Sequence, residues 1–567
     1  MKNRILLLAT LFLAFTVSCT DDFDEINEQP DKLGVSDVSA KFFVTSLQKG
    51  LFKPTAGPLW FGQIFHQDQY AGQHAGGHSQ YAWDGNFGWE YTGWLQEGTN
   101  GWLAGYNSSL TAYLNLVGEG GTLENDKYYA IGLIMKGLYY QLYTDQVGMI
   151  PYSEASNPDI TLPKYDAQID IYEGVISELN QAISIIGDNV LTGTGVDILS
   201  DNDVLFNGDL QKWKQLANSL KLRMALRAHG ASGASSKPII ANAADEAVKS
   251  GVLGDSDALF TSFNEVANIW VEHCNYGDIY YGFGAAGAWK VAEPLVNALS
   301  MYDDPRLSKM SKPSEGGTVT IDISGGESGD PMTADQIAFL KSTLDNAGLV
   351  LDTDYTWTQT ADELTITIDE NTHHIGLPVR LSPKIKGLFD GTLFSDPADI
   401  VINQSNKDTD IYPFVVMSAA DSHFMVAEAI VKGLATGDAS AHYATGLDHA
   451  MNLWGTSTDA DFLASEMGSL TGTTEEKLEK IATQRWIANY TNGYEAWSIV
   501  RDTGYPSSAI TTSTDNDIRS LSGSMNGAYA NRLRYISSAY TSNADNIAAA
   551  VSAQGADDKT TKLWWAK

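Results

Sequence analysis

The chain has little positive charge for its length. Its 567 residues include 36 lysines and arginines against 70 aspartates and glutamates, a formal net charge of −34. Binding to nucleic-acid phosphates or to anionic lipid needs basic patches, so this balance argues against nucleic-acid partners and against electrostatic membrane docking. Hydrophobic residues make up 43% and charged residues 19%, which excludes a mostly disordered chain.

Long apolar runs are also absent. After the first 18 residues no stretch reaches 18 consecutive apolar positions, so we expect residues 19–567 to be soluble apart from any attached lipid. The one apolar run near the start, residues 5–17, is too short to span a bilayer of ~30 Å as a lasting helix. It follows Lys2 and Arg4, and this order is typical of a secretory signal peptide.

Motifs of known catalytic machineries are missing. There is no Gly-x-Ser-x-Gly nucleophile elbow and no Walker loop, and residues 192–195 lack the spacing of a dinucleotide fingerprint. A glycosidase needs only two carboxylates about 5–9.5 Å apart, and 70 acidic residues offer too many pairs to be informative. We therefore expect no enzyme, no catalytic residues and no cofactor.

Two groups of residues resemble metal sites without completing one. His74 and His78 have four-residue spacing with His66 upstream, but the glycines between them disfavour a helix and no third ligand is evident, so we expect solvated loop histidines. Residues 201–203 offer oxygens for Ca²⁺ but lack the glycine and closing glutamate of a calcium loop, so we expect a polar turn before a helix. The sequence predicts no metal site.

The signal peptide ends in a box similar to that of bacterial lipoproteins. Small residues precede Cys19, which would become the lipidated first residue after removal of residues 1–18. Residues 19–40 then form an acidic tether, with four acids among residues 20–25. If Cys19 is acylated, Cys274 has no disulfide partner and is expected to be a buried free thiol.

Amphipathic helix patterns dominate the rest of the chain. Asp209 suits the N-cap of a helix over 210–229, and Thr473 with Glu476 forms a capping box for a helix over 475–490. Apolar residues at three- and four-residue steps predict further helices. These lie at 124–144, which is apolar on nearly all sides and so central, and at 170–186, 422–434 and 439–454.

The predicted fold class is mostly α, with tetratricopeptide-like helix pairs, although no clean 34-residue repeat is present. We expect residues 41–567 to form a single domain. Within it, residues 313–412 predict a loop-rich insertion, where alternating runs at 317–323 and 364–368 indicate small β-hairpins. Residues 505–545 predict a polar tail with few helices.

Aromatic residues are abundant, with 14 Trp and 26 Tyr, and two clusters lie in irregular sequence where exposed rings are plausible. Flat rings pack on the apolar C–H faces of sugar rings, while polar neighbours bind hydroxyl groups. Aromatic residues within the helices, such as Trp213, Tyr443 and Trp454, are expected in the core. The first cluster comprises Tyr81, Trp83, Phe87, Trp89, Tyr91, Trp94, Trp102 and Tyr106; the second comprises Trp270, Tyr276, Tyr280, Tyr281, Phe283 and Trp289, with His273, Asn275 and Asp278 among them. Tyr355 and Trp357 form a minor third pair.

Several strings, in order along the chain, resemble the SusD/RagB family of nutrient-binding outer-membrane lipoproteins, in particular its second SusD-like branch. They are CTDDFDEIN at 19–27, LYTDQVGMIPYSEA at 142–155, PKYD at 163–166, FNGDL at 206–210, WKQLANSLKLR at 213–223, QRWI at 484–487 and RDTGYP at 501–506. The chain departs from the family pattern at residues 147–149, at Val500-Arg501, and at Ser422-His423, where Glu-Val is commoner. We interpret these positions as structural.

The resemblance implies a cell-surface protein of the outer membrane, anchored through Cys19 and covering a SusC-like TonB-dependent transporter. It would capture an oligosaccharide, or sometimes a peptide, and deliver it without catalysis. From the clusters we expect the ligand-binding residues to be Trp83, Trp89, Trp270, Asn275, Tyr276, Tyr280, Tyr281 and Trp289. Two alternatives are a secreted all-α glycoside hydrolase and a transporter scaffold that binds no ligand.

Overall fold

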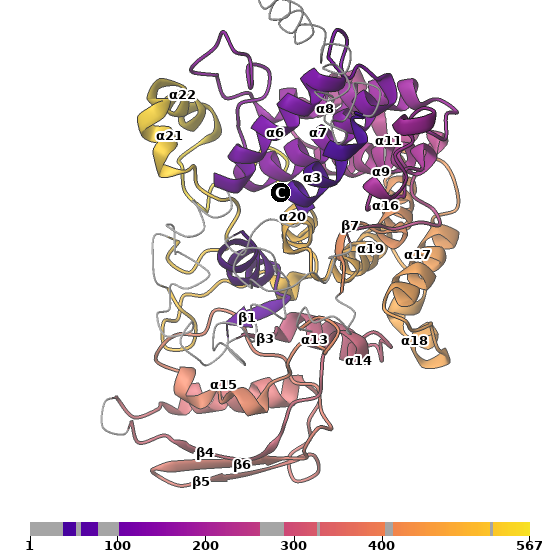
Figure 1. The fold of residues 1–567 in the computed structure, drawn as a ribbon. Coiled ribbons are helices and arrows are strands. Elements are labelled where there is room, and N and C mark those ends of the chain that lie inside the picture. The colour runs from indigo at the N-terminus through magenta and orange to yellow at the C-terminus, as the bar shows by residue number, and fades with distance from the viewer. Residues whose placement is uncertain are drawn as a thin grey trace, which may run out of the picture.

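A computed structural model describes residues 38–52, 58–76, 101–260, 289–325, 329–402, 412–521 and 525–566. Most helices of the first half of the chain gather at the top of Figure 1. They are α3 (Lys41–Phe52), α6 (Gly101–Val117), α7 (Asp126–Val147), α8 (Gln168–Ile186), α9 (Leu210–Ala228), α10 (Pro238–Ala241) and α11 (Ala243–Ser250). Neighbours in sequence pack on one another, α6 on α7, α7 on α8 and α8 on α9, which confirms a mostly helical fold.

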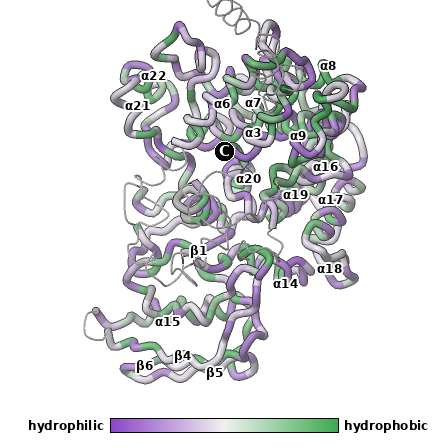
Figure 2. The backbone as a smooth tube through the Cα atoms, viewed as in Figure 1, coloured by the Kyte–Doolittle hydropathy of each residue, from purple (hydrophilic) through white to green (hydrophobic). Residues whose placement is uncertain are grey.

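Helices of the second half continue this body. They are α16 (Ala419–Val431), α17 (Ala439–Leu453), α18 (Ala460–Ala464), α19 (Thr474–Ala488) and α20 (Gly493–Thr503), followed by α21 (Ser537–Ser542) and α22 (Ala544–Gln554). Helix α16 packs on α17, α19 and α9, so the two halves share one interface. Figure 2 shows apolar segments where α9, α16 and α19 meet.

The helix ends agree with the capping residues that the sequence predicts. The carboxylate of Asp209 accepts hydrogen bonds from the backbone N–H groups of Gln211 and Lys212 at the start of α9. Thr473 and Glu476 form the reciprocal capping box that begins α19. Each cap satisfies backbone N–H groups that have no partner within the helix, and so fixes where the helix begins.

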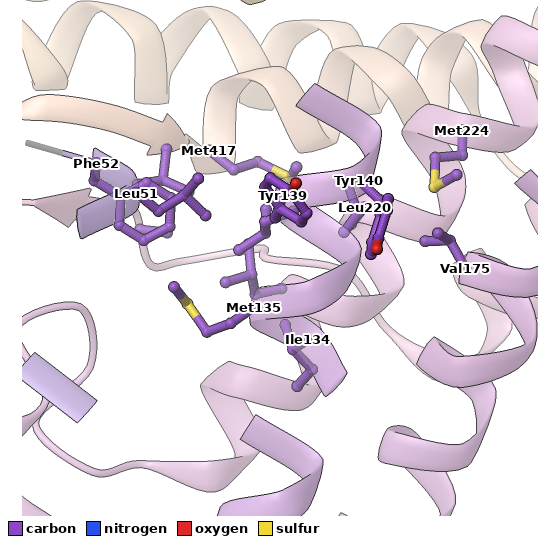
Figure 3. Close-up of a cluster of buried hydrophobic side chains, with 14 of the residues drawn as sticks. Leu51, Phe52, Ile134, Met135, Tyr139, Tyr140, Val175, Leu220, Met224 and Met417 are labelled. Carbon is purple, nitrogen blue, oxygen red and sulfur yellow. The ribbon is translucent and has the colours of Figure 1, made fainter. Parts of the chain in front are cut away.

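The largest core lies around α7, which is central, as its all-round apolar pattern predicts. Its buried side chains belong to one hydrophobic cluster with those of α3, α8, α9 and a strand, β7 (Phe414–Met417). Trp213, Tyr443 and Trp454 are 0%, 1% and 6% exposed, which confirms them as core residues. Figure 3 shows part of the core, with labels on Leu51, Phe52, Ile134, Met135, Tyr139, Tyr140, Val175, Leu220, Met224 and Met417.

The remaining strands are short and form separate small sheets. β1 (His74–Gly76) pairs with β3 (Trp289–Val291), and β2 (Ala258–Phe260) pairs with β7, both antiparallel. A three-stranded antiparallel sheet has the order β4 (Gly317–Asp322), β6 (Glu363–Ile368), β5 (Tyr355–Gln359). The runs predicted at 317–323 and 364–368 therefore are strands, and they pair with each other.

The insertion contains more order than the sequence predicts. Helix α15 (Ala334–Asn346) covers the three-stranded sheet at the lower end of Figure 1, and together they enclose a hydrophobic cluster of their own. Short helices α13 (Glu293–Ser300) and α14 (Leu307–Met310) lead into this unit. Within the described ranges no helix is both long and apolar enough to cross a membrane.

Candidate functional site

Most of the predicted ligand residues lie outside the described residues. These are Trp83, Trp89, Trp270, Asn275, Tyr276, Tyr280 and Tyr281, together with Cys19 and Cys274, for which the sequence predicts lipidation and a free thiol. Three aromatic residues at the cluster ends are described: Trp102 and Tyr106, which close the first cluster, and Trp289, which closes the second.

The structure corrects the interpretation of these three residues. Trp102 and Tyr106 lie within helix α6 rather than in irregular sequence, and Tyr106 is 6% exposed. Trp289 is 1% exposed, and its ring meets the ring of His74 edge-on, with centroids 4.8 Å apart. A buried ring has no free face for a sugar, so the prediction that Trp289 is a stacking platform is wrong for this structure.

Each aromatic cluster is nevertheless joined at one end to the ribbon of β1 and β3. The first cluster follows Gly76, the last residue of β1, and the second ends at Trp289, the first residue of β3. Gly76 and Trp289 are direct partners in the antiparallel β1–β3 ribbon. These two attachment points are therefore side by side, although they are more than 200 residues apart in sequence.

A buried polar chain holds this ribbon in place. His74 donates from Nδ1 to the carboxylate of Asp68 over 3.1 Å, and its Nε2 accepts from the hydroxyl of Tyr490 over 3.0 Å. All three residues are buried, and burial raises the pKa of Tyr490, with the nearby carboxylate of Asp68 adding to the shift. The tyrosine therefore stays protonated and serves as the donor that completes the chain.

The ribbon is also fixed from its other side. The ammonium group of Lys290, which is 3% exposed, pairs with Asp396 at 2.7 Å. The backbone of Val291 donates to Ser395 and accepts from Leu377, both in the insertion. The ribbon is thus a rigid base between the helical body and the insertion.

A glycine allows the body to approach this base closely. A Cβ at Gly493, the first residue of α20, would lie 1.9 Å from an oxygen of Asp68. Such contacts do not occur in folded proteins, so only glycine permits α20 to pack against the Asp68–His74 pair.

A small cavity lies beside the start of α6. Trp102, at the start of α6, and Phe414, beside the end of β2, both line it, together with Phe52 and Tyr494. Its polar wall includes Gln146 and Glu495. The cavity volume is about 90 Å³, below the ~300–1,000 Å³ of typical ligand pockets, so it suits water or one small group rather than an oligosaccharide.

A larger groove of about 840 Å³ lies on the outer face of α6 and α7. Its floor includes Lys136, which pairs with Glu178 at 2.5 Å and lies 5.2 Å from the ring centre of Tyr152. The loop that carries Tyr152 is fastened to α6, because Asn107 donates to the hydroxyl of Ser156 over 2.7 Å. The sequence did not reveal this groove, since its walls come from separate segments that only folding brings together.

The densest group of charges forms a sealed network rather than a reactive site. Asp421 pairs with Arg223 at 2.8 Å and with Arg485 at 2.9 Å, and these three side chains are 1–3% exposed. Burial alone would raise the pKa of Asp421, but the two guanidinium groups outweigh it and hold the pKa below its usual value. Glu495 continues the network to Arg227 at 2.5 Å, and Arg227 also pairs with Asp145.

This network joins α7, α9, α16, α19 and α20. Its carboxylates are buried and paired with arginines, and the pKa of Asp421 is lowered, whereas a general acid needs a raised pKa and access to a substrate. We therefore assign it to the scaffold.

The structure also shows the environment of the residues that the sequence analysis considered as metal ligands. His74 and His66 are 0% and 1% exposed, so the expectation of solvated loop histidines is wrong for both, and His78 lies outside the described residues. Asp203 receives hydrogen bonds from Gln48, Trp213 and two backbone N–H groups, which confirms a structural turn. Among the described residues, no group of three or more His, Cys, Asp or Glu side chains is arranged to hold a metal ion.

Comparison with solved structures finds the same fold along nearly the whole chain. A structure described as a chitin-binding protein has a TM-score of 0.69 and 21% identity, covering 93% of this chain and 100% of its own. A SusD homologue from Bacteroides uniformis ATCC 8492 has a TM-score of 0.69 and 22% identity, covering 94% and 100%. One from Bacteroides thetaiotaomicron VPI-5482 has a TM-score of 0.65 and 22% identity, covering 93% and 99%.

Comparison with curated proteins gave no match. The sequence model of one family, SusD-like_2, described as "Starch-binding associating with outer membrane", matches residues 34–351 and 379–525. Since this match covers most of the chain and includes α7, α9, α16, α19 and α20, the chain belongs to the SusD-like family of outer-membrane-associated proteins.

Proposed function

We propose that this protein is a cell-surface receptor that captures oligosaccharides and delivers them to a SusC-like TonB-dependent transporter. Membership of a family described as starch-binding and associated with the outer membrane supports a role in glycan binding and nutrient uptake. The observation that carries the site is the pairing of Gly76 with Trp289, because it joins both aromatic clusters to one rigid base.

The aromatic residues of the two clusters act on one ligand. Trp83 and Trp89 from the first cluster, and Trp270, Tyr276, Tyr280 and Tyr281 from the second, supply faces for sugar rings, while Asn275 binds hydroxyl groups. Trp289 has a different role from these residues. Buried against His74, it supports the base from which the second cluster extends.

The ligand is a neutral glycan. A net charge of −34 repels strongly anionic polysaccharides over long range, whereas neutral chains approach without this barrier. A structural neighbour is described as a chitin-binding protein, and chitin is a neutral polysaccharide, in keeping with this class.

Anchoring through a lipid on Cys19 would hold the protein at the cell surface, where it meets its ligand. The acidic tether 19–40 leads to α3, whose entry is fixed by a hydrogen bond of 2.8 Å from Ser39 to Asp197. Replacement of Cys19 by alanine is expected to release the protein from the outer-membrane fraction without changing its fold. Membrane fractionation of the two forms tests this.

A glycan screen tests the binding function. Purified wild-type protein and a Trp270→Ala variant are applied to neutral oligosaccharides, with Tyr540→Ala as the control, since Tyr540 is 41% exposed on α21. We expect a ligand that wild type and the control bind and that Trp270→Ala binds at least about tenfold more weakly, a loss of ~1.4 kcal/mol. Equal binding by all three proteins would contradict the site.

The same samples distinguish the two other functions. A glycoside hydrolase would shorten the bound oligosaccharide, which mass spectrometry of the recovered ligand detects. A scaffold without a ligand would co-purify with a transporter barrel and bind no glycan. Our proposal requires intact ligand and co-purification together.

A further inference from the structure

Three of the ten histidines in the chain gather on the hairpin of α16 and α17. His423 lies on α16, and His442 and His449 lie two turns apart on α17. The ring of His423 lies between the other two, with centroids 5.2 Å from His442 and 5.5 Å from His449. This cluster is far in sequence from the aromatic clusters, and the proposed function makes no use of it.

Close packing of the two helices brings these histidines together. Gly446 of α17 faces Phe424 of α16, and a Cβ at Gly446 would lie 2.6 Å from that ring. The absence of a side chain lets the backbones approach. At this close approach the imidazoles of His423 and His442 contact each other across the two helices.

The hydrogen bonds of His423 define which of its ring nitrogens carries the proton and which bears a lone pair. The Nε2 of His423 lies 3.1 Å from the carbonyl oxygen of Gly254, so it carries the proton and donates it. The Nδ1 of a neutral His423 therefore bears a lone pair, and it lies 3.0 Å from the Nδ1 of His442. A histidine whose second nitrogen donates to a backbone carbonyl is oriented as metal-binding histidines usually are.

We propose that His423 and His442 form a two-histidine chelate for a divalent late transition-metal ion, with water as the remaining ligands. Two nitrogens 3.0 Å apart, at metal–nitrogen bonds of ~2.1 Å, subtend an angle of about 90° at the metal. This is a cis angle of tetragonal geometry, which Ni²⁺ and Cu²⁺ adopt, rather than a tetrahedral angle. In the structure the two Nδ1 atoms point at each other and share the proton of His442. On binding, that proton moves to Nε2 of His442, and the two partly exposed rings turn so that both Nδ1 lone pairs face the ion.

The environment of His423 and His442 also favours metal binding. His423 and His442 are both partly exposed, so an ion can reach them. Neutral imidazoles are the form that binds metal. His449 stacks on His423 with an interplanar angle of 9° and is not one of the two proposed ligands.

Calorimetric titration of the purified protein with NiCl₂ at pH 7.5, repeated with CuCl₂, tests the proposal. Wild type is expected to bind one ion per chain, and His423→Gln and His442→Gln to bind it about tenfold or more weakly. His449→Gln and His373→Gln are the controls and should bind as wild type does. His373 is suitable because it also has a histidine neighbour, His374, whose Nδ1 instead contacts Ser311.

Thermal unfolding gives a second readout that does not depend on heat of binding. Ni²⁺ should raise the Tm of wild type, because an ion held between α16 and α17 binds the folded state only. It should leave the Tm of His442→Gln unchanged, because that variant lacks one of the two ligands. The proposal is wrong if wild type takes up neither ion, or if both pair variants retain wild-type affinity.

Discussion

Glu428 is a buried carboxylate held between two cations, Lys432 at 2.5 Å and Arg485 at 2.8 Å. Burial alone would raise its pKa, but these cations lower it from 4.5 to about 2. A depressed pKa in the folded state contributes stability above pH 4.5 and loses it as the pH falls towards 2. The shift corresponds to roughly 3 kcal/mol.

We therefore expect wild type to lose stability steeply below pH 4.5. In Glu428→Gln this part of the pH dependence should disappear, while stability at pH 7 falls by about 3 kcal/mol, because Arg485 loses a buried partner. Urea unfolding from pH 7 to pH 3 measures both effects. Glu119→Gln, at an exposed position, is the control, and an unchanged acid dependence in Glu428→Gln would contradict the assignment.

Asp203 lies in the segment that the sequence offered as a possible Ca²⁺ site, and the structure shows that its carboxylate holds a turn instead. It accepts four hydrogen bonds, including 2.8 Å from the indole of Trp213 and 2.6 Å from the amide of Gln48. Asp203→Ala leaves these buried donors unpaired and should cost about 3 kcal/mol or more, whereas Asp201→Ala, at an exposed position, should cost less than about 0.5 kcal/mol. Urea unfolding compares the two, and similar losses would show that the turn is not held by Asp203.

At the scale of elements, local signals predicted local features. Asp209, Thr473 and the apolar periodicity of α7–α9 placed helices within a few residues of their observed ends, because caps and periodicity act within one or two turns. Helix α6 was missed because its aromatic and small residues resemble a loop, and its helical form depends on packing against α7.

Prediction of the candidate site was also limited to what local sequence signals can show. Composition identified both aromatic clusters, but which face of Trp289 is covered depends on His74, more than 200 residues earlier. Residues 334–346 lie in a stretch rich in polar residues, and the capping box of Thr333 and Gln336 that begins α15 was overlooked there. A contact between distant segments decided the first case, and one sequence does not contain it in readable form, whereas the signal for α15 was local and readable.

The unit of α15 with β4, β5 and β6 has a hydrophobic cluster separate from that of the helical body. Leu340 is fully buried in it, so Leu340→Ala should cost ~2–5 kcal/mol within this unit. Hydrogen exchange is expected to accelerate in α15 and the three strands while α7 and α9 remain protected. Leu463→Ala, 50% exposed on α18, should leave the pattern unchanged, and equal acceleration throughout would show one cooperative unit.

For the whole molecule, net charge sets how ligands approach. A charge of −34 should slow association of an anionic oligosaccharide, and salt should relieve this because the screening length falls to ~10 Å at 0.1 M. We expect its association rate to rise severalfold between about 20 and 200 mM NaCl, while that of a neutral analogue stays constant. Stopped-flow fluorescence measures both rates, and an equal response of the two ligands would contradict long-range repulsion.

The central claim is that both aromatic clusters bind one ligand above the β1–β3 base. Calorimetric titration of the glycan found by screening, with wild type, Trp83→Ala, Trp270→Ala and the double variant, tests this most directly. We expect one ligand per chain and a loss of affinity of about tenfold or more in each single variant. Wild-type affinity in both single variants, or two independent binding events, would contradict it.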